Sequence, residues 1–306
     1  MIRYLLRRLL LSVVTLIAVI VIVSGMLHVS GDPVAVMLQS GIASQEERET
    51  LRQELGLDRP FILQAIDFIV GVVQGDLGYS LRFRKAAAPL IIERLPATLQ
   101  LALVAMLVAL VVAIPVGILS AMKPHSTVDY AGRLLTLAGQ SIPMFWLGIM
   151  AVLVFSVKLR WLPSAGRLEP TSIILPATTL GLFPMARIAR ILRASMLEVL
   201  NRDYIRTARA KGLSESKTLI GHALRNSAIP VVTVTGLQFG ILLGGALVTE
   251  TIFSWPGVGL LAIQAVTNRD FPLLRAIVLV MALSFVSINL ITDVLYAYLD
   301  PRIRYE

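Results

Sequence analysis

Six apolar stretches, each close to the length of a membrane-crossing helix, decide what this chain can fold into. A helix needs about 20 apolar residues to cross the hydrocarbon of a bilayer. The first stretch begins at Leu9, and the others are Ala97–Met122, Leu134–Val157, Thr171–Leu192, Ala228–Glu250 and Pro272–Tyr298. The composition agrees, since 15% of the 306 residues are charged, against about 25% in soluble proteins. We therefore expect an all-α integral membrane protein with six transmembrane helices.

The first 28 residues also have features of a secretory signal, namely a basic start followed by an apolar run. The run is longer than a typical signal core, and no small-x-small cleavage site follows it. We interpret this segment as a retained transmembrane helix, with a cleaved signal as the alternative.

Lysine and arginine in the short loops predict the orientation, because cytoplasmic loops are enriched in both. One side of the membrane has sixteen of these lysine and arginine residues, namely Arg3, Arg7, Arg8, Lys123, Arg133, nine residues between Arg187 and Arg225, Arg302 and Arg304. The other side holds five, namely Lys158, Arg160, Arg167, Arg269 and Arg275. Both termini are therefore expected in the cytoplasm, and residues 29–96 outside.

The external segment carries helix signals. Ser44 and Glu47 form a capping box, and Gly56 and Pro60 separate this polar helix from the apolar stretch "PFILQAIDFIVGVVQG". The apolar stretch is too short to span and is expected on the membrane surface or against the bundle. A loosely packed insertion without a role is the alternative. The expected organisation is a first helix (1–28), an external segment (29–96), a transmembrane domain (97–298) with a cytoplasmic loop (199–227), and a tail (299–306).

Prolines and glycines inside the apolar stretches predict closely packed, kinked helices. The prolines are Pro115, Pro143, Pro176 and Pro184, and each leaves a carbonyl that neighbouring helices must satisfy. The fifth stretch has Gly236, Gly240, Gly244 and Gly245. A strip of this kind permits close helix packing, with a hinge or a pore-lining role as the alternative.

The segment "RTARAKGLSESKTLIGHALRN", residues 206–226, is strongly basic and lies between the fourth and fifth apolar stretches. Asp203 is expected to cap a helix over "YIRTARAK", and Gly212 to end it in the left-handed conformation. A helix of about eight residues is not stable alone in water, so it needs a surface to dock on.

A second helix is expected to follow directly. Ser214 is its predicted N-cap, and Pro230 is expected to open the fifth span. Its apolar stripe is Leu219, Ile220, Ala223 and Leu224.

Three other interpretations of the basic segment exist. It can be a positive-inside loop without a partner. A nucleic-acid surface is disfavoured because no aromatic residues accompany the charges. A phosphate-binding loop is disfavoured because "GLSESKT" has the wrong spacing and no preceding strand.

Few residues suggest chemistry inside the membrane. The chain has no cysteine, and His28, His125 and His222 do not lie at metal-ligand spacing. No nucleophile-elbow pattern indicates a hydrolase. Three polar residues within the spans are candidates for lining a path, with interhelical hydrogen bonding as the alternative: Gln140, Gln238 and Asn289. A stand-alone ion-coupled carrier is disfavoured because it would more often place ionisable groups at mid-membrane.

The basic segment resembles the cytoplasmic "EAA" loop of binding-protein-dependent ABC importers. Ala208, Gly212 and Leu224 match that pattern, whereas Arg206, Thr207, His222 and Arg225 replace its Glu, Ala, Ile and Pro. The chain is similar throughout to the first-permease subunit of dipeptide, oligopeptide, nickel and glutathione importers. The similarity includes "GDPVAVML", "LRQELGLDRPF", "QGDLGYSL", "ERLPATL", "YIRTARAKGLSESKTLIGHALRNSAIPVVT", "ETIFSWPGVGLL" and "DVLYAYLDPRIRY".

The resemblance implies a type I importer permease in a bacterial inner membrane, non-catalytic by itself. The implied partners are a second homologous permease, two ATPase subunits and an extracytoplasmic substrate-binding protein, besides the lipid bilayer. ATP and magnesium would be bound by the ATPases, and this chain would hold no cofactor or nucleic acid. The implied ATPase-coupling residues are Tyr204, Ile205, Arg206, Thr207, Ala208, Arg209, Ala210, Lys211, Gly212, Leu213, Ser214 and Leu224. The cargo, whether a peptide, a nickel chelate or glutathione, does not follow from the sequence.

Overall fold

The computed structural model describes residues 2–29 and 59–299, and it is built of helices with one short hairpin. Within these residues, five segments are long and apolar enough to cross a membrane: Arg7–Met26, Ala87–Met122, Pro170–Leu200, Glu215–Ile252 and Phe271–Val294. A bent pair of helices between Thr127 and Lys158 makes a sixth. The predicted six spans are thus present. The predicted polar helix at Ser44 and the "DPRIRY" ending lie outside the described residues.

The third span is broken, contrary to the single helix expected over Leu134–Val157. Helix α6 (Thr127–Ser141) is followed by α7 (Met144–Ala151) and the π-helix η1 (Val152–Lys158), and the two parts meet at 103°. Ile142 is extended between them, as a residue before proline prefers to be. Pro143 therefore ends one helix and caps the next, whereas Pro115 and Pro184 lie inside helices that continue.

The chain divides into two compact units. The first comprises residues 1–98 and 256–287, and the second comprises residues 99–255 and 288–306. Helices α5 (Ala87–Met122) and α13 (Phe271–Leu299) each begin in the first unit and continue into the second.

The first unit contains α1 (Ile2–Val29), α4 (Phe61–Val73), α12 (Val258–Thr267), the opening turns of α5 and most of α13. Helix α4 is the predicted short apolar helix, with Pro60 at its N-cap. It packs against the bundle, because Ala65 and Phe68 form a small core with Ile20 of α1 and Leu279 of α13.

A hairpin in this unit is anchored to the start of α13. Strand β1 (Tyr79–Ser80) pairs antiparallel with β2 (Lys85–Ala86). The buried Asp270 carboxylate accepts hydrogen bonds from the Ser80 hydroxyl at 2.5 Å and from the backbone N–H groups of Leu81 and Arg82. The same carboxylate accepts from the Leu273 N–H in the first turn of α13. One side chain therefore holds two segments that are far apart in the sequence.

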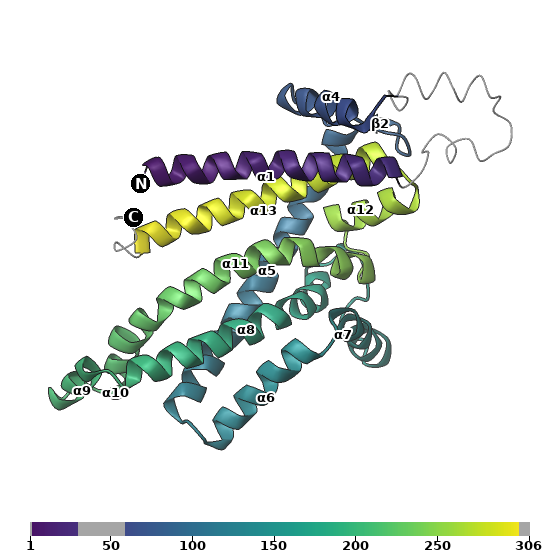
Figure 1. Ribbon diagram of the computed structural model, residues 1–306. Coiled ribbons are helices and arrows are strands. Elements are labelled where there is room, and N and C mark those ends of the chain that lie inside the picture. Colours follow the sequence, from purple (N-terminus) through teal and green to yellow (C-terminus); the bar gives the residue numbers. More distant parts are fainter. Residues whose placement is uncertain (1, 30–58, 300–306) are drawn as a thin grey trace. The chain divides into compact units, whose positions relative to one another are not determined.

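The second unit is organised around α8 (Ile174–Leu200), which follows the 3-10 turn η2 (Pro170–Ile173). Figure 1 shows α8 between α6 and α11 (Arg225–Ile252), and it contacts both. Of the expected glycine strip on α11, Gly236 permits close packing against α13. An added Cβ at this position would lie 2.0 Å from Cγ2 of Thr292. Gly244 is exposed, and an added Cβ there would meet nothing within 4 Å. Close packing within the chain is therefore confirmed at Gly236, whereas Gly244 meets no other helix of the described residues.

Candidate functional site

The predicted cytoplasmic loop forms a short helix, α9 (Asp203–Ala210), directly after α8. The predicted N-cap is wrong by one residue, because Arg202 occupies the cap position and Asp203 is the first helical residue. Asp203 still suits this position, since a carboxylate in the first turn complements the helix dipole. Its side chain lies 3.5 Å from the Arg206 guanidinium, and both are exposed. This is the contact made by the arginine that replaces the glutamate of the "EAA" pattern.

Gly212 ends α9 as predicted. Its φ is +79°, a conformation that glycine adopts without a steric penalty. The Leu213 N–H donates to the Ala208 carbonyl at 3.3 Å, and the Gly212 N–H donates to the Arg209 carbonyl at 2.9 Å. These two bonds are the Schellman pattern, which satisfies the last carbonyls of the helix. The turn is therefore a specified structure and not a flexible link.

Helix α9 packs against the helical segment that follows it through two buried side chains. Ile205 and Ala208 are its buried side chains, at 0% and 6% exposure. They belong to the side of α9 that packs against η3 (Thr218–Leu224), a π-helix that follows α10 (Glu215–Lys217). This supplies the docking surface that an eight-residue helix requires.

The expected apolar stripe of the second helix is partly wrong. Leu219 and Ala223 are buried and Leu224 is half-buried, but Ile220 is 67% exposed and Thr218 is buried instead. The reason is the i→i+5 hydrogen bonding of a π-helix, which shifts the side chains relative to an α-helical period.

An ion pair joins the two sides of the Gly212 turn. Arg209 donates from Nε and Nη2 to the two carboxylate oxygens of Glu215, at 2.9 and 3.3 Å. Ser214 occupies the predicted N-cap of α10, although its hydroxyl makes no capping hydrogen bond. The remaining side chains of the predicted coupling residues face outward, namely Tyr204, Arg206, Thr207, Ala210, Lys211 and Leu213.

The segment after the turn is continuous with the fifth span. Residues Glu215–Ile252 form one helical run, so Pro230 lies inside α11 and does not open the span. Leu224 is the last residue of η3 and lies at the junction with α11. A displacement of α9 and its docking surface would therefore act on a helix of 38 residues.

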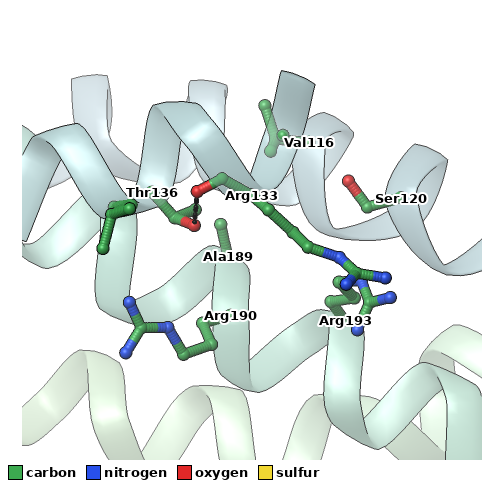
Figure 2. A pocket seen from close by; sticks show the side chains of 9 residues that line it. Val116, Ser120, Arg133, Thr136, Ala189, Arg190 and Arg193 are labelled. Atoms are coloured by element: carbon green, nitrogen blue, oxygen red, sulfur yellow. Dashed lines mark hydrogen bonds between the residues drawn. The ribbon is translucent and has the colours of Figure 1, made fainter. Parts of the chain in front are cut away.

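A buried carboxylate, which the sequence analysis did not single out, connects α6 with α8. Asp129 is fully buried and accepts two hydrogen bonds from each of Arg133 and Arg193. The Arg193 bonds are 2.7 and 2.9 Å long, and the His125 N–H donates a further one at 3.0 Å. Figure 2 shows the Arg133 and Arg193 guanidinium groups beside each other, at a pocket of about 350 Å³. The "STVD" capping pattern from Ser126 to Asp129 was the available sequence signal.

The exposed face of α8 between its two neighbours carries charge. The residues of this face recur every three or four positions and form what we name the α8 stripe: Phe183, Arg187, Arg190, Ala194 and Glu198. The opposite side of the helix is buried. Arg187 is the middle residue of the 27 in α8, and Arg187 and Arg190 both lie within the stretch Thr171–Leu192 that is expected to span the membrane.

The predicted path residues do not meet in one place. Gln238 is 2% exposed, and its Oε1 accepts from Nη1 of Arg187 at 3.4 Å. Gln140 and Asn289 are half-buried, and no hydrogen bond joins any two of the three amides in the described part of the chain. The hydrogen bond from Arg187 on α8 accounts for the buried amide of Gln238 on α11, as the interhelical alternative expects. The same bond places an exposed arginine beside Gln238.

The described residues contain no group of three histidine, aspartate or glutamate side chains that could hold a metal ion. His222 is exposed on η3, and His125 takes part in the α5–α6 turn through its backbone.

The six candidate spans, of which the third is broken, and the docked helix α9 define a multi-spanning membrane protein with a structured helical loop. Two family models match the chain. One is the binding-protein-dependent transport system inner membrane component, over residues 113–305, and the other is the N-terminal part of such membrane components, over residues 1–102. The chain belongs to this family of ABC importer permeases.

Characterised relatives are similar over the whole chain. The dipeptide transport system permease protein DppB of Escherichia coli K12 is 41% identical, and the glutathione transport system permease protein GsiC of E. coli O6:H1 is 43% identical. Each similarity covers all of both chains. The di/tripeptide transport system permease protein DppB of Pseudomonas aeruginosa is 40% identical.

Among solved structures, a permease chain of the MetNI methionine ABC transporter has the same fold. The TM-score is 0.59 at 17% identity, over 69% of this chain and 96% of that chain. A chain of an amino acid ABC transporter gives a TM-score of 0.55 at 15% identity, over 69% and 94%. These similarities establish the type I permease fold.

Proposed function

We propose that this chain forms half of an ATP-driven path that imports a small peptide or a similar solute. The relatives named for dipeptides, di- and tripeptides and glutathione support this cargo class. In the proposed complex the chain pairs with a second, homologous permease. Two ATPase subunits bind ATP and magnesium, and an extracytoplasmic binding protein delivers the solute. The chain itself catalyses no reaction.

The observation that carries this proposal is the construction of α9. It is short, closed at its C-terminus by the Schellman turn at Gly212, exposed on one side and docked on the other, as we expect of a part that transmits force. The outward residues Tyr204, Thr207 and Lys211 are free to contact an ATPase subunit. The buried residues Ile205 and Ala208 seat α9 on η3. Ala208 therefore serves the coupling through close packing within the chain and not through direct contact with the ATPase.

The proposed orientation places both termini and α9 in the cytoplasm of a bacterial inner membrane. The excess of lysine and arginine on that side supports it, and the excess remains thirteen against five when Arg187, Arg190 and Arg193 of α8 are left out. Residues 29–96, which include α4 and the hairpin, then face the side from which the binding protein approaches.

Cross-linking from single cysteines tests the proposal, because the natural chain contains none. Thr207→Cys, labelled in the assembled complex with a maleimide that carries a benzophenone, is expected to form a cross-link to an ATPase subunit on illumination, because the excited benzophenone inserts into C–H bonds and needs no thiol on the partner. Leu168→Cys is the matched control, since Leu168 is 97% exposed but lies in a loop predicted outside. A cross-link from Leu168→Cys to the ATPase, or none from Thr207→Cys, would contradict the proposed coupling site and orientation.

A further inference from the structure

We propose that Arg187 and Arg190, on the α8 stripe, form a cationic subsite in the translocation path that holds a carboxylate of the passing solute. This inference rests on the proposed function, since it requires that a path runs along this face of α8.

The first argument is the contrast between α8 and a helix whose exposed face suits lipid. The outward side chains of α5 are aliphatic, including Leu103, Leu107 and Val111. The outward face of α8 instead presents two arginines inside the stretch Thr171–Leu192, which the sequence predicts to span the membrane. Charged residues within membrane helices nearly always face a protein interior or a water-filled cavity. The α8 stripe is therefore the face of this unit that points away from lipid.

The second argument is the difference among the three arginines of α8. Arg193 is paired with Asp129, to which it donates two hydrogen bonds. Arg187 makes one long hydrogen bond to the neutral Gln238 and no ion pair within the described residues. Arg190 makes no hydrogen bond or ion pair within the described residues, and Figure 2 shows it turned away from the Arg133 and Arg193 pair.

The spacing suits a single anionic group. Arg187 and Arg190 are three residues apart, and side chains at this spacing are neighbours on a helix surface. A planar guanidinium presents paired N–H donors that match the two oxygens of a carboxylate. Every peptide with a free C-terminus carries a carboxylate, so the subsite fits the proposed cargo class without selecting one side chain.

The experiment compares two water-soluble thiol reagents at one engineered cysteine. Ala194→Cys places the thiol on the α8 stripe, one turn from Arg190, in a chain without cysteines. In the complete reconstituted complex, its reaction rates are measured with a methanethiosulfonate that carries a sulfonate and with one that carries a trimethylammonium group. We expect both to react, with the sulfonate reagent favoured. Adding Arg190→Gln or Arg187→Gln should lower the sulfonate-to-ammonium rate ratio by roughly threefold to tenfold for each change. Val111→Cys, on the aliphatic face of α5, is the control and should not react.

The outcomes separate this inference from the proposed function. If Ala194→Cys does not react, the α8 stripe faces lipid or a packed helix and not water. If the sulfonate-to-ammonium rate ratio is unchanged by both Arg187→Gln and Arg190→Gln, the two arginines create no positive potential at this site. Either result overturns the subsite. The rate ratio does not depend on which solute is imported, whereas solute uptake by the unmodified complex tests the proposed function separately. Normal assembly of each variant, measured by co-purification with its partners, shows that the fold is retained.

Discussion

Replacement of Gly212 offers the most specific test of the role of α9. A residue with a side chain at φ of +79° carries a steric cost of about 1–2 kcal/mol, and a β-branched residue carries more. Because α9 has only eight residues and is held by two buried side chains, we expect its docked state to be only marginally stable. A cost of this size lowers the docked-to-undocked ratio about 5- to 30-fold.

The series should therefore be graded. Gly212→Asn is expected to have a mild effect, since asparagine tolerates the left-handed region. Gly212→Ala should have a moderate effect, and Gly212→Val a severe one. The control is Gly221→Ala, because Gly221 is exposed in the same loop and an added Cβ meets nothing within 4 Å. A helical glycine replaced by alanine should be neutral or slightly stabilising.

The assay measures solute imported per ATP hydrolysed, in proteoliposomes that contain the complete complex. We expect this ratio to fall progressively from Asn to Ala to Val, by up to the factor given above for Ala and by more for Val, while the amount of assembled complex stays the same. Gly221→Ala should match the unmodified chain. If Gly212→Val imports with the normal ratio, or if Gly212→Ala and Gly221→Ala behave alike, then the geometry of this turn does not carry the coupling.

Three further predictions concern the second unit. Asp129→Asn should lower the free energy of unfolding of the complex by about 2–4 kcal/mol, because its two arginines lose a shared buried carboxylate; an unchanged thermal midpoint would contradict this. Gly236→Ala should cost about 1–3 kcal/mol by overpacking against Thr292, and Gly244→Ala should cost nothing, as thermal unfolding of the two variants would show. Arg187→Gln should reduce uptake of a dipeptide with a free C-terminus by roughly threefold relative to the same dipeptide with an amidated C-terminus, and equal changes for both would refute the effect.

The elements that the sequence predicted are those specified by local signals. The spans follow from the length of their apolar runs, and α4 follows from an apolar run after Pro60. The end of α9 follows from Gly212, because few residues other than glycine are common in that conformation. Each of these features depends on residues adjacent in the chain.

The features that the sequence did not predict depend on residues far apart. Asp129 and Arg193 are 64 positions apart, and only the packing of α6 against α8 brings them together. The inward orientation of Ala208 depends on where η3 lies, and the π-helical geometry of η3 moves Ile220 out of the expected stripe. The exposed arginines of α8 were counted as loop charges, because hydropathy alone does not show where a long helix ends.

Dependence of import on ATP tests the central claim most directly. In proteoliposomes with the complete complex, we predict that uptake of a labelled dipeptide requires the binding protein outside and ATP on the side of α9. Uptake should also persist when a protonophore collapses the proton gradient. Uptake by the chain alone, driven by an ion gradient and without ATP, would contradict the account, because it would make this protein a carrier that needs neither partner nor coupling helix.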